Sequence, residues 1–262
     1  MGQEIERAAG SLEALYRSGA LSNEASDAFA AVEAAADIGA ALGKWSANDE
    51  LLLASILVDD STSITYQIDE IRSGHKQMLE ALRAEPFEAD VQVHTRLLNH
   101  GVLAPYKDLA SATALTEQNY NVAHLEKVTP LYLQSLLTLG TVMAKAQEEA
   151  SRGVKTRTFT LLITDGGNNS GSVTANQVRA LVTDVLDFAT NHIVAAMGIG
   201  DPSYFQTVFQ SMGIPEKWIF TPGASVDELR RMFREIAHSL ALAASSETAF
   251  TQLLLGPPSD SR

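Results

Sequence analysis

The chain has 262 residues, 45% of them hydrophobic, which is enough for one large α/β domain with an appendage. Its 19 basic and 32 acidic residues give a net charge of −13, so a bare phosphate backbone would be repelled and nucleic acid is not an expected ligand. Because the chain has no cysteine, it can form neither a disulfide nor a thiolate metal site.

The N-terminal region is predicted to be helical. The first residues are charged and lead into no continuous apolar segment, so we expect no signal peptide. No stretch approaches the ~20 apolar residues of a membrane-spanning helix, and a cytoplasmic protein is the resulting expectation. Residues 11–43 are rich in alanine, and Ser22 stands where a helix is expected to start, so they favour a helical hairpin. We interpret residues 1–48 as a helical extension, either packed on the main domain or used for docking or self-association.

From residue 51, strand and helix patterns alternate, which indicates a doubly wound, mostly parallel sheet with helices on both faces. Strands are predicted at Leu51–Val58, Val91–Leu98, Thr158–Ile163, His192–Ile199 and Lys217–Phe220, with a short edge strand near Val102–Lys107. Helices are predicted at Ile64–Leu82, Thr129–Ala150, Ala175–Thr190 (capped by Thr174) and Val226–Leu242. The rest of 99–128 reads as irregular, and Gly198-Ile199-Gly200-Asp201 reads as a turn. We place the main domain at 49–243 and expect a partly disordered tail at 244–262.

Three oxygen-bearing side chains directly follow the first strand. Because side chains alternate along an extended chain, Asp59, Ser61 and Ser63 point the same way, and Asp60 is expected to face away from them. Carboxylate and hydroxyl oxygens are hard ligands of the kind that Mg²⁺ and Mn²⁺ prefer. Taken alone, the pattern is also that of a polar turn after a buried strand.

Two more segments bring oxygen ligands to the same edge of the predicted sheet. Thr129 stands at the head of a predicted helix, and Asp165 follows the strand that ends at Ile163. Asn168 and Asn169 are typical turn residues, and they are also candidates for contacts with a partner at the rim.

The six histidines of the chain show no metal-ligand spacing. His94 and His100 flank a strand end, which could bring them near the same crevice, although a satisfied or solvated histidine is the simpler interpretation.

The oxygen ligands resemble the metal-ion-dependent adhesion site of the von Willebrand factor A (VWA) family. All five family positions are matched, in order, by Asp59, Ser61, Ser63, Thr129 and Asp165. The resemblance covers roughly residues 50 to 242 and implies the Rossmann-like VWA fold. It departs from the family at Lys127-Val128, where a pair of small residues, often Gly-Gly, commonly precedes the threonine. The shape of that loop is therefore not implied by the resemblance.

The resemblance also implies a ligand and a role. The ion would be Mg²⁺, or else Mn²⁺ or Ca²⁺, with direct bonds from Ser61 and Ser63 and with Thr129 and the two aspartates contributing directly or through water. A carboxylate from a partner protein would complete the shell. This describes a protein-interaction module rather than an enzyme, working within an intracellular multi-protein assembly. Cytoplasmic VWA-like proteins often act alongside AAA+ ATPases of the MoxR type.

Two other functions stay open. In a metal-dependent phosphohydrolase, an aspartate after a central strand can begin the active site, and a second carboxylate follows two residues later. In this chain that later position is occupied by Ser61, which has no carboxylate. No lysine or histidine lies close enough in the sequence to nominate as general acid. The other alternative is a structural subunit with a non-essential metal site.

Overall fold

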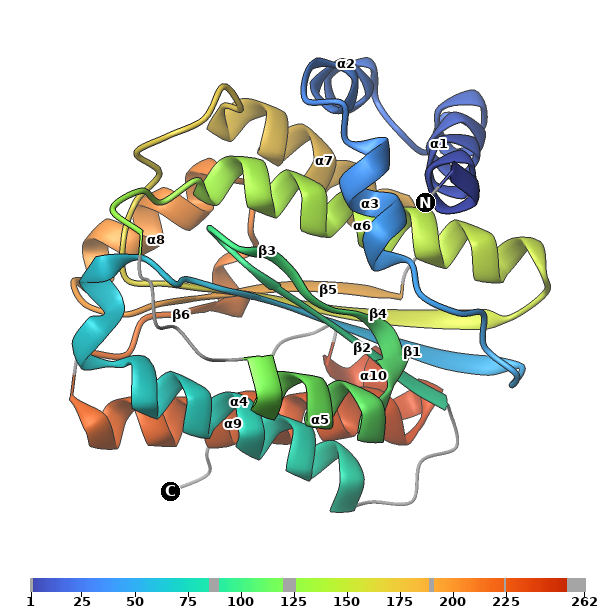
Figure 1. Cartoon of the computed structure of the whole chain (residues 1–262). Coiled ribbons are helices and arrows are strands. Elements are labelled where there is room, and N and C mark those ends of the chain that lie inside the picture. Colours follow the sequence, from blue (N-terminus) through green and yellow to red (C-terminus); the bar gives the residue numbers. More distant parts are fainter. Residues whose placement is uncertain (1, 85–89, 120–125, 189–190, 224, 254–262) are drawn as a thin grey trace.

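The computed structural model describes residues 2–84, 90–119, 126–188, 191–223 and 225–253. Within these residues, a sheet with the strand order β3-β2-β1-β4-β5-β6 lies between two layers of helices (Figure 1). The strands are β1 (Glu50–Val58), β2 (Asp90–Leu97), β3 (Gly101–Asp108), β4 (Lys155–Thr164), β5 (His192–Gly198) and β6 (Ile219–Phe220). Every pair of neighbours is parallel except β2 and β3, which are antiparallel. The predicted doubly wound α/β fold is confirmed.

Strand β1 lies in the middle of the sheet because both of its faces are apolar. Leu52 and Ile56 belong to the core on one side of the sheet, whereas Leu51 and Leu57 belong to the cores on the other. The carboxyl ends of the central strands are aligned, since Val58 is in register with both Leu97 of β2 and Ile163 of β4. The loops that leave β1 and β4 therefore start side by side.

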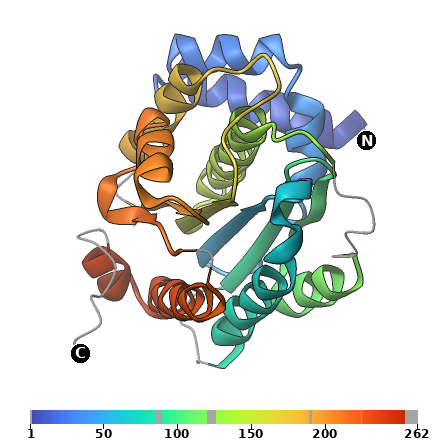
Figure 2. The same cartoon turned by 90° about the vertical axis from the view of Figure 1, so that its left-hand side faces the viewer.

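The two helical layers differ in composition (Figures 1 and 2). One face of the sheet is covered by α4 (Ile68–Ala84), α5 (Leu109–Asn119), α9 (Val226–Ser245) and α10 (Glu247–Leu253). The other face is covered by α6 (Leu131–Ser151), α7 (Ala175–Phe188) and α8 (Pro202–Ser211). Short 3₁₀ helices at Thr62–Tyr66 (η1) and Glu216–Trp218 (η2) connect strands to helices.

Two helices between residues 49 and 243 were not predicted from the sequence. Helix α5 lies in the segment read as irregular, and it begins where the Asp108 carboxylate accepts a hydrogen bond from the Ser111 N–H at 2.9 Å. Helix α8 follows the predicted turn, and the Asp201 carboxylate caps it by accepting from the Ser203 and Tyr204 N–H groups. An N-cap aspartate followed by proline is a helix-start signal, so Asp201-Pro202 could have predicted α8.

The packed domain continues past residue 243. Helix α9 runs to Ser245, and α10 follows after Ser246, whose hydroxyl accepts a hydrogen bond from the Ala249 N–H at 3.1 Å. Phe250 and Leu253 are buried in the core of this face. The first part of the expected tail is thus a helix held by two apolar side chains, and residues 254–262 lie outside the described residues.

The N-terminal extension forms α1 (Gly2–Arg17), α2 (Asn23–Ala31) and α3 (Ala35–Ala41), which is one helix more than the predicted hairpin. The Ser22 hydroxyl accepts from the Ala25 N–H, so the predicted helix start is confirmed. Phe29 and Ile38 pack closely on α6, where a Cβ added to Gly140 would lie 2.7 Å from the Phe29 ring. The extension therefore shares a core with the main domain.

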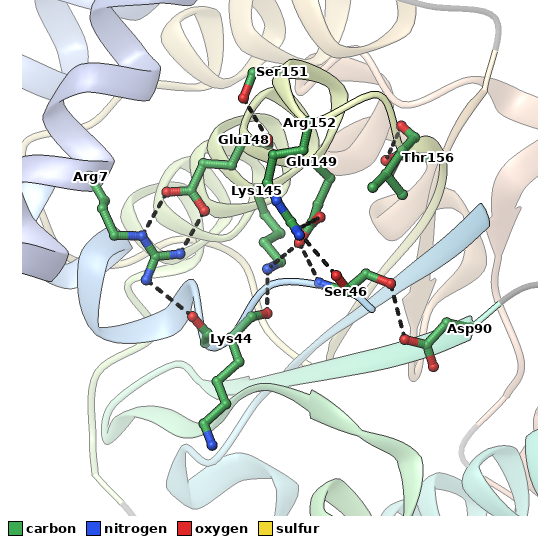
Figure 3. Close-up of polar contacts among 12 residues, drawn as sticks. Arg7, Lys44, Ser46, Asp90, Lys145, Glu148, Glu149, Ser151, Arg152 and Thr156 are labelled. Atoms are coloured by element: carbon green, nitrogen blue, oxygen red, sulfur yellow. Dashed lines mark hydrogen bonds and ion pairs between the residues drawn. The ribbon is translucent and has the colours of Figure 1, made fainter. Parts of the chain in front are cut away.

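Buried ion pairs fix the linker between α3 and β1 at the amino end of the sheet (Figure 3). The Lys145 ammonium, fully buried, lies 2.7 Å from a Glu149 oxygen and donates to the Lys44 carbonyl at 2.6 Å. The Arg152 guanidinium lies 2.8 Å from the other Glu149 oxygen. Because a buried charge is tolerated only when it is paired, these contacts hold the linker in one position.

Candidate metal centre

The predicted ligand loops meet at the carboxyl edge of the sheet, as a doubly wound topology requires. Strand β1 pairs with β2 on one side and with β4 on the other. The chain runs from β1 to β2 and β3 on one side and then crosses over to β4 on the other side of β1. The Asp59 N–H donates to the Ile163 carbonyl at 2.9 Å, which extends the β1–β4 pairing into the loop.

Four of the five predicted ligands are linked by direct polar contacts. The Ser61 N–H donates to Asp59 Oδ1 at 2.8 Å, and the Ser61 and Ser63 hydroxyl oxygens are 2.9 Å apart. The Ser63 hydroxyl then donates to Asp165 Oδ1 at 2.7 Å. The alternation of side chains after β1 thus aligns Asp59, Ser61 and Ser63 on one side of the loop, facing Asp165.

The fifth predicted ligand, Thr129, lies beside this group. A Cβ added to Gly166, the residue after Asp165, would lie 3.6 Å from the Thr129 hydroxyl oxygen. Helix α6 begins at Leu131, so Thr129 precedes the helix. The prediction that Thr129 opens this helix is wrong. Although Lys127-Val128 replaces the family's small pair, the preceding Glu126 carbonyl accepts from the Thr62 N–H at 2.8 Å and ties this segment to the first ligand loop.

Asn168 and Asn169 hold the start of α6 against the loop after β4. Asn169 Oδ1 accepts from the Thr129 N–H at 2.6 Å, and the Asn169 N–H donates to the Thr129 carbonyl at 3.1 Å. Asn168 Oδ1 accepts from the Tyr132 N–H at 3.1 Å. Both side-chain oxygens accept hydrogen bonds from within the chain, so Asn169 positions Thr129 and Asn168 positions the first turn of α6.

Thr164 is a site residue that the sequence analysis missed. Its buried hydroxyl donates to Asp59 Oδ2 at 2.5 Å and accepts from the Gly166 N–H at 3.0 Å. With Ser61 bonded to Oδ1, both oxygens of the Asp59 carboxylate are oriented. No local sequence signal marks Thr164, because it lies 105 residues from Asp59 in the chain.

The two carboxylates of the site are placed where a negative charge is costly. Asp59 is 0% exposed, and burial raises the pKa of its carboxyl group. Burial, and to a smaller extent the charge of Asp59, raises the pKa of Asp165 to about 6, against the opposing effect of the Ser63 hydrogen bond. A bound cation would favour the charged form of both groups.

The donor set fits a small divalent cation. In an octahedral shell with Mg–O bonds of about 2.1 Å, neighbouring ligand oxygens are about 3.0 Å apart. The Ser61–Ser63 and Ser63–Asp165 oxygens are 2.9 and 2.7 Å apart, close to that edge length. The described residues contain no cluster of three or more His, Asp and Glu side chains that could hold a metal. A site here would thus depend on its hydroxyl groups.

Asp60 faces away from these ligands, as its position in the alternation predicted. Its Oδ1 accepts from the Asn99 N–H at 2.8 Å, and its Oδ2 contacts Nδ1 of His100. The His100 side chain is 46% exposed at the turn after β2, on the same edge of the sheet. His94 instead packs in the interior against Tyr106, with ring centroids 5.3 Å apart, and burial lowers its pKa well below the usual value.

Comparison with known proteins identifies the fold. No family model and no curated protein matches this chain. Among solved structures, the pilus adhesin SpaC of Lactobacillus rhamnosus GG aligns with a TM-score of 0.57 and 14% identity over 77% of this chain and 31% of its own. Proximal thread matrix protein 1 from the mussel byssus aligns with a TM-score of 0.51 and 15% identity over 73% of this chain and 46% of its own. A von Willebrand factor type A protein from Catenulispora acidiphila aligns with a TM-score of 0.50 and 15% identity over 73% of this chain and 43% of its own.

The chain has the fold of a von Willebrand factor A domain. It spans less than half the length of each of these three solved chains. Another structure of the mussel protein, with a TM-score of 0.50, 16% identity and coverage of 74% of this chain and 46% of its own, is described as having a zinc-occupied MIDAS motif. Among the helices that the structure describes, none is both long and apolar enough to span a bilayer.

Proposed function

We propose that this chain is a cation-dependent protein-interaction module. Its cation is held by Asp59, Ser61, Ser63, Thr129 and Asp165, and a partner protein supplies a carboxylate that completes the coordination shell. The observation that carries the proposal is the unbroken series of hydrogen bonds from Asp59 through the two serines to Asp165. The mussel protein with a zinc-occupied MIDAS and the pilus adhesin support it by analogy of fold.

The composition of the site suits this role. When bound, the cation supplies a Lewis-acidic position for an incoming carboxylate. Three of the five side chains are neutral hydroxyls, so the site carries at most two negative charges and repels a third carboxylate less than an all-acidic site would. The Thr164 hydroxyl and the Ser61 N–H hold the Asp59 carboxylate in place, and Asn169 holds Thr129.

Within this proposal the cation is Mg²⁺, because the site is small and made of hard oxygen atoms, with Mn²⁺ and Ca²⁺ as substitutes. We further propose a cytoplasmic, multi-protein setting, with an AAA+ ATPase of the MoxR type as the first partner to test. This part rests on the sequence resemblance to cytoplasmic VWA-like proteins.

Metal binding tests the ligand assignment directly. We expect Ser63→Ala to weaken Mn²⁺ binding, measured by calorimetry and by electron paramagnetic resonance, by ~10-fold or more. The matched control is Thr65→Ala, which removes a hydroxyl from the same loop that donates only to the Thr62 carbonyl. Equal Mn²⁺ affinity of Ser63→Ala and wild type would remove Ser63 from the site.

Partner capture tests the interaction. Lysate of the source organism is passed over the wild type and the Asp59→Ala, Ser61→Ala double variant, each with Mg²⁺ and with EDTA. Proteins retained only by the wild type with Mg²⁺ would support the mechanism and would show whether an AAA+ ATPase is among them. Identical retention in all four arms would place the interaction on another surface, such as the N-terminal helices.

One observation favours the phosphohydrolase alternative. The Asp60–His100 contact gives this edge of the sheet a histidine oriented by a buried carboxylate, which is the arrangement of a general acid or base. If the chain hydrolyses p-nitrophenyl phosphate with Mg²⁺, and His100→Gln and Asp59→Ala both abolish turnover, the enzyme assignment replaces the interaction module. A structural subunit would instead keep its partners when the metal ligands are replaced.

A further inference from the structure

Exposed apolar side chains gather around the candidate metal centre. Among the described residues, the exposed large hydrophobic side chains are Ile5, Tyr16, Trp45, Tyr66, Val128, Tyr204 and Val226. The first three belong to the N-terminal helices and their linker. The other four, which we call the apolar rim, lie at the carboxyl edge of the sheet: Tyr66, Val128, Tyr204 and Val226.

Each ligand loop has one member of the rim next to it. Tyr66, 92% exposed, follows Ser63 by three residues, and Val128, 44% exposed, directly precedes Thr129. Tyr204, 48% exposed, reaches from α8 to the loop of Asp165, since a Cβ added to Gly167 would lie 2.0 Å from its hydroxyl oxygen.

Val226 stands at the start of α9, which follows β6 at the same edge. Figure 1 shows the segment between β1 and α4, helix α8 and the start of α9 at one end of the molecule, on the left. The rim therefore lies at the same end of the molecule as the proposed metal ligands. A Tyr side chain that is 92% exposed contributes little to folding, whereas aromatic side chains are enriched at the energetic centres of interfaces.

The charges at this edge restrict the partner further. Exposed carboxylates here are Asp69, Glu126, Asp201, Asp227 and Glu228, each at the start of a helix or beside a ligand loop. Two carboxylates of this edge are paired with arginines, since Asp69 lies 3.6 Å from Arg72 and Glu70 lies 3.5 Å from Arg230. The remaining exposed carboxylates have Lys127 and His100 exposed beside them, so the edge stays acidic. A partner rich in acidic residues would be repelled outside the metal centre, whereas basic residues in its periphery would be attracted.

We propose that the partner presents a single Asp or Glu flanked by aliphatic or aromatic side chains, with basic residues farther out. The carboxylate binds the cation, the apolar neighbours pack on Tyr66, Val128 and Tyr204, and the basic residues face the outer carboxylates. This inference rests on the proposed function, because it requires the cation to receive the carboxylate. It adds the apolar and basic parts of the recognised surface.

The test is a selection from a random peptide library displayed on phage. The library is bound to the wild-type chain in Mg²⁺ and eluted with EDTA. We expect eluted sequences to contain Asp or Glu with apolar residues within two positions and basic residues beyond them. Eluted sequences with an acidic residue but without apolar enrichment would overturn the inference and leave the proposed function intact. If EDTA elutes no enriched sequence, the proposed function fails, and the inference fails with it.

Variants of the rim provide a second, independent measurement. A selected peptide is expected to bind Tyr66→Ala and Tyr204→Ala ~10-fold or more weakly than the wild type, while the Mn²⁺ affinity of both variants stays unchanged. Tyr16→Ala is the matched control, since Tyr16 is 46% exposed on α1, away from the rim. Unchanged peptide affinity in both rim variants would overturn the inference, whereas lost Mn²⁺ affinity would show that these residues support the metal site instead.

Discussion

The Asp59 carboxylate depends on one buried hydroxyl, that of Thr164. In Thr164→Val the side chain keeps its volume, but Asp59 Oδ2 loses the donor at 2.5 Å and the Gly166 N–H loses its acceptor. We expect Mn²⁺ affinity, measured by calorimetry, to fall by about 10-fold or more, because groups that orient metal ligands commonly contribute this much. The free energy of unfolding without metal should fall by roughly 1–3 kcal/mol.

The control for this change lies on the same strand. Thr160 is also fully buried in β4, but its hydroxyl has no hydrogen-bond partner among the described residues. Thr160→Val removes an unsatisfied polar group, so it should leave Mn²⁺ affinity unchanged without destabilising the protein. If both variants bind Mn²⁺ like the wild type, Thr164 has no part in orienting Asp59.

Thr129 is positioned by a second residue outside the ligand set, Asn169. The variant Asn169→Ala removes the acceptor of the Thr129 N–H at 2.6 Å but keeps the backbone bond from residue 169 to the Thr129 carbonyl. We expect Mn²⁺ affinity to fall several-fold, less than in Ser63→Ala, because Thr129 keeps one of its two anchors. An affinity loss greater than that of Ser63→Ala would show that Asn169 does more than position Thr129.

At this scale, the sequence predicts residues whose roles follow from local geometry. The alternation after β1 predicted both the alignment of Asp59 with Ser61 and Ser63 and the opposite direction of Asp60. Thr164 and the contact of His100 with Asp60 were not predicted, because the partners are 105 and 40 residues apart in the chain. The pairing of β1 with β2 and β4 brings these partners together, and a single sequence does not reveal which strands pair.

Helices α4 and α9 approach each other closely at Gly74. A Cβ added to this residue would lie 2.2 Å from the buried ring of Phe233. In an ordinary helix interior, Gly→Ala is stabilising by about 1 kcal/mol. We expect Gly74→Ala to lower the free energy of unfolding by roughly 1–3 kcal/mol instead, as overpacked cores do, measured by urea denaturation.

Gly10, exposed in α1, is the matched control for this element. A Cβ added to it would meet no atom within 4 Å, so Gly10→Ala should stabilise the protein by about 0.5–1 kcal/mol. Stabilisation by both substitutions would mean that α4 and α9 are packed less closely than described.

Elements with strong periodicity were predicted, whereas two short helices that begin at an aspartate were missed. The apolar runs of β1 and β4 and the amphipathic pattern of α9 marked these elements in the sequence. Helices α5 and α8 have only 11 and 10 residues, and each begins at an aspartate that also fits a turn. At such positions, tertiary packing decides whether the chain forms a turn or starts a helix.

For the whole molecule, the N-terminal helices are part of the fold's packing rather than a separate unit. Leu15, Phe29 and Ile38 are buried in the same cluster as Leu136 of α6 and Val182 of α7. The alanine-rich composition predicted helices here, but it could not show that a layer of them would cover α6 and α7. Residues 2–41 therefore extend the helical layer on this side of the sheet (Figure 2).

The buried histidines make the stability of the whole molecule depend on pH. Burial lowers the pKa of His75 and of His192 to about 4 each, below the usual value of 6.5. As the pH falls below 6.5, the two histidines become protonated in the unfolded chain before they do so in the folded chain. The stability that the two neutral histidines contribute is therefore complete above pH 6.5 and is lost as the pH falls towards 4.

The variant His192→Asn isolates one of these contributions, because asparagine keeps a polar atom near Nδ1, which lies 2.7 Å from the Thr158 hydroxyl. Between pH 7 and pH 5, the wild type should lose about 2 kcal/mol more unfolding free energy than this variant. Urea denaturation at both pH values measures the difference between the two proteins. The raised pKa of Asp165 changes stability with pH in the opposite direction, but it does so equally in both proteins and cancels. His238→Asn, at an exposed position of α9, should retain the wild-type pH dependence. Parallel pH profiles of wild type and His192→Asn would show that His192 is protonated equally readily in both states.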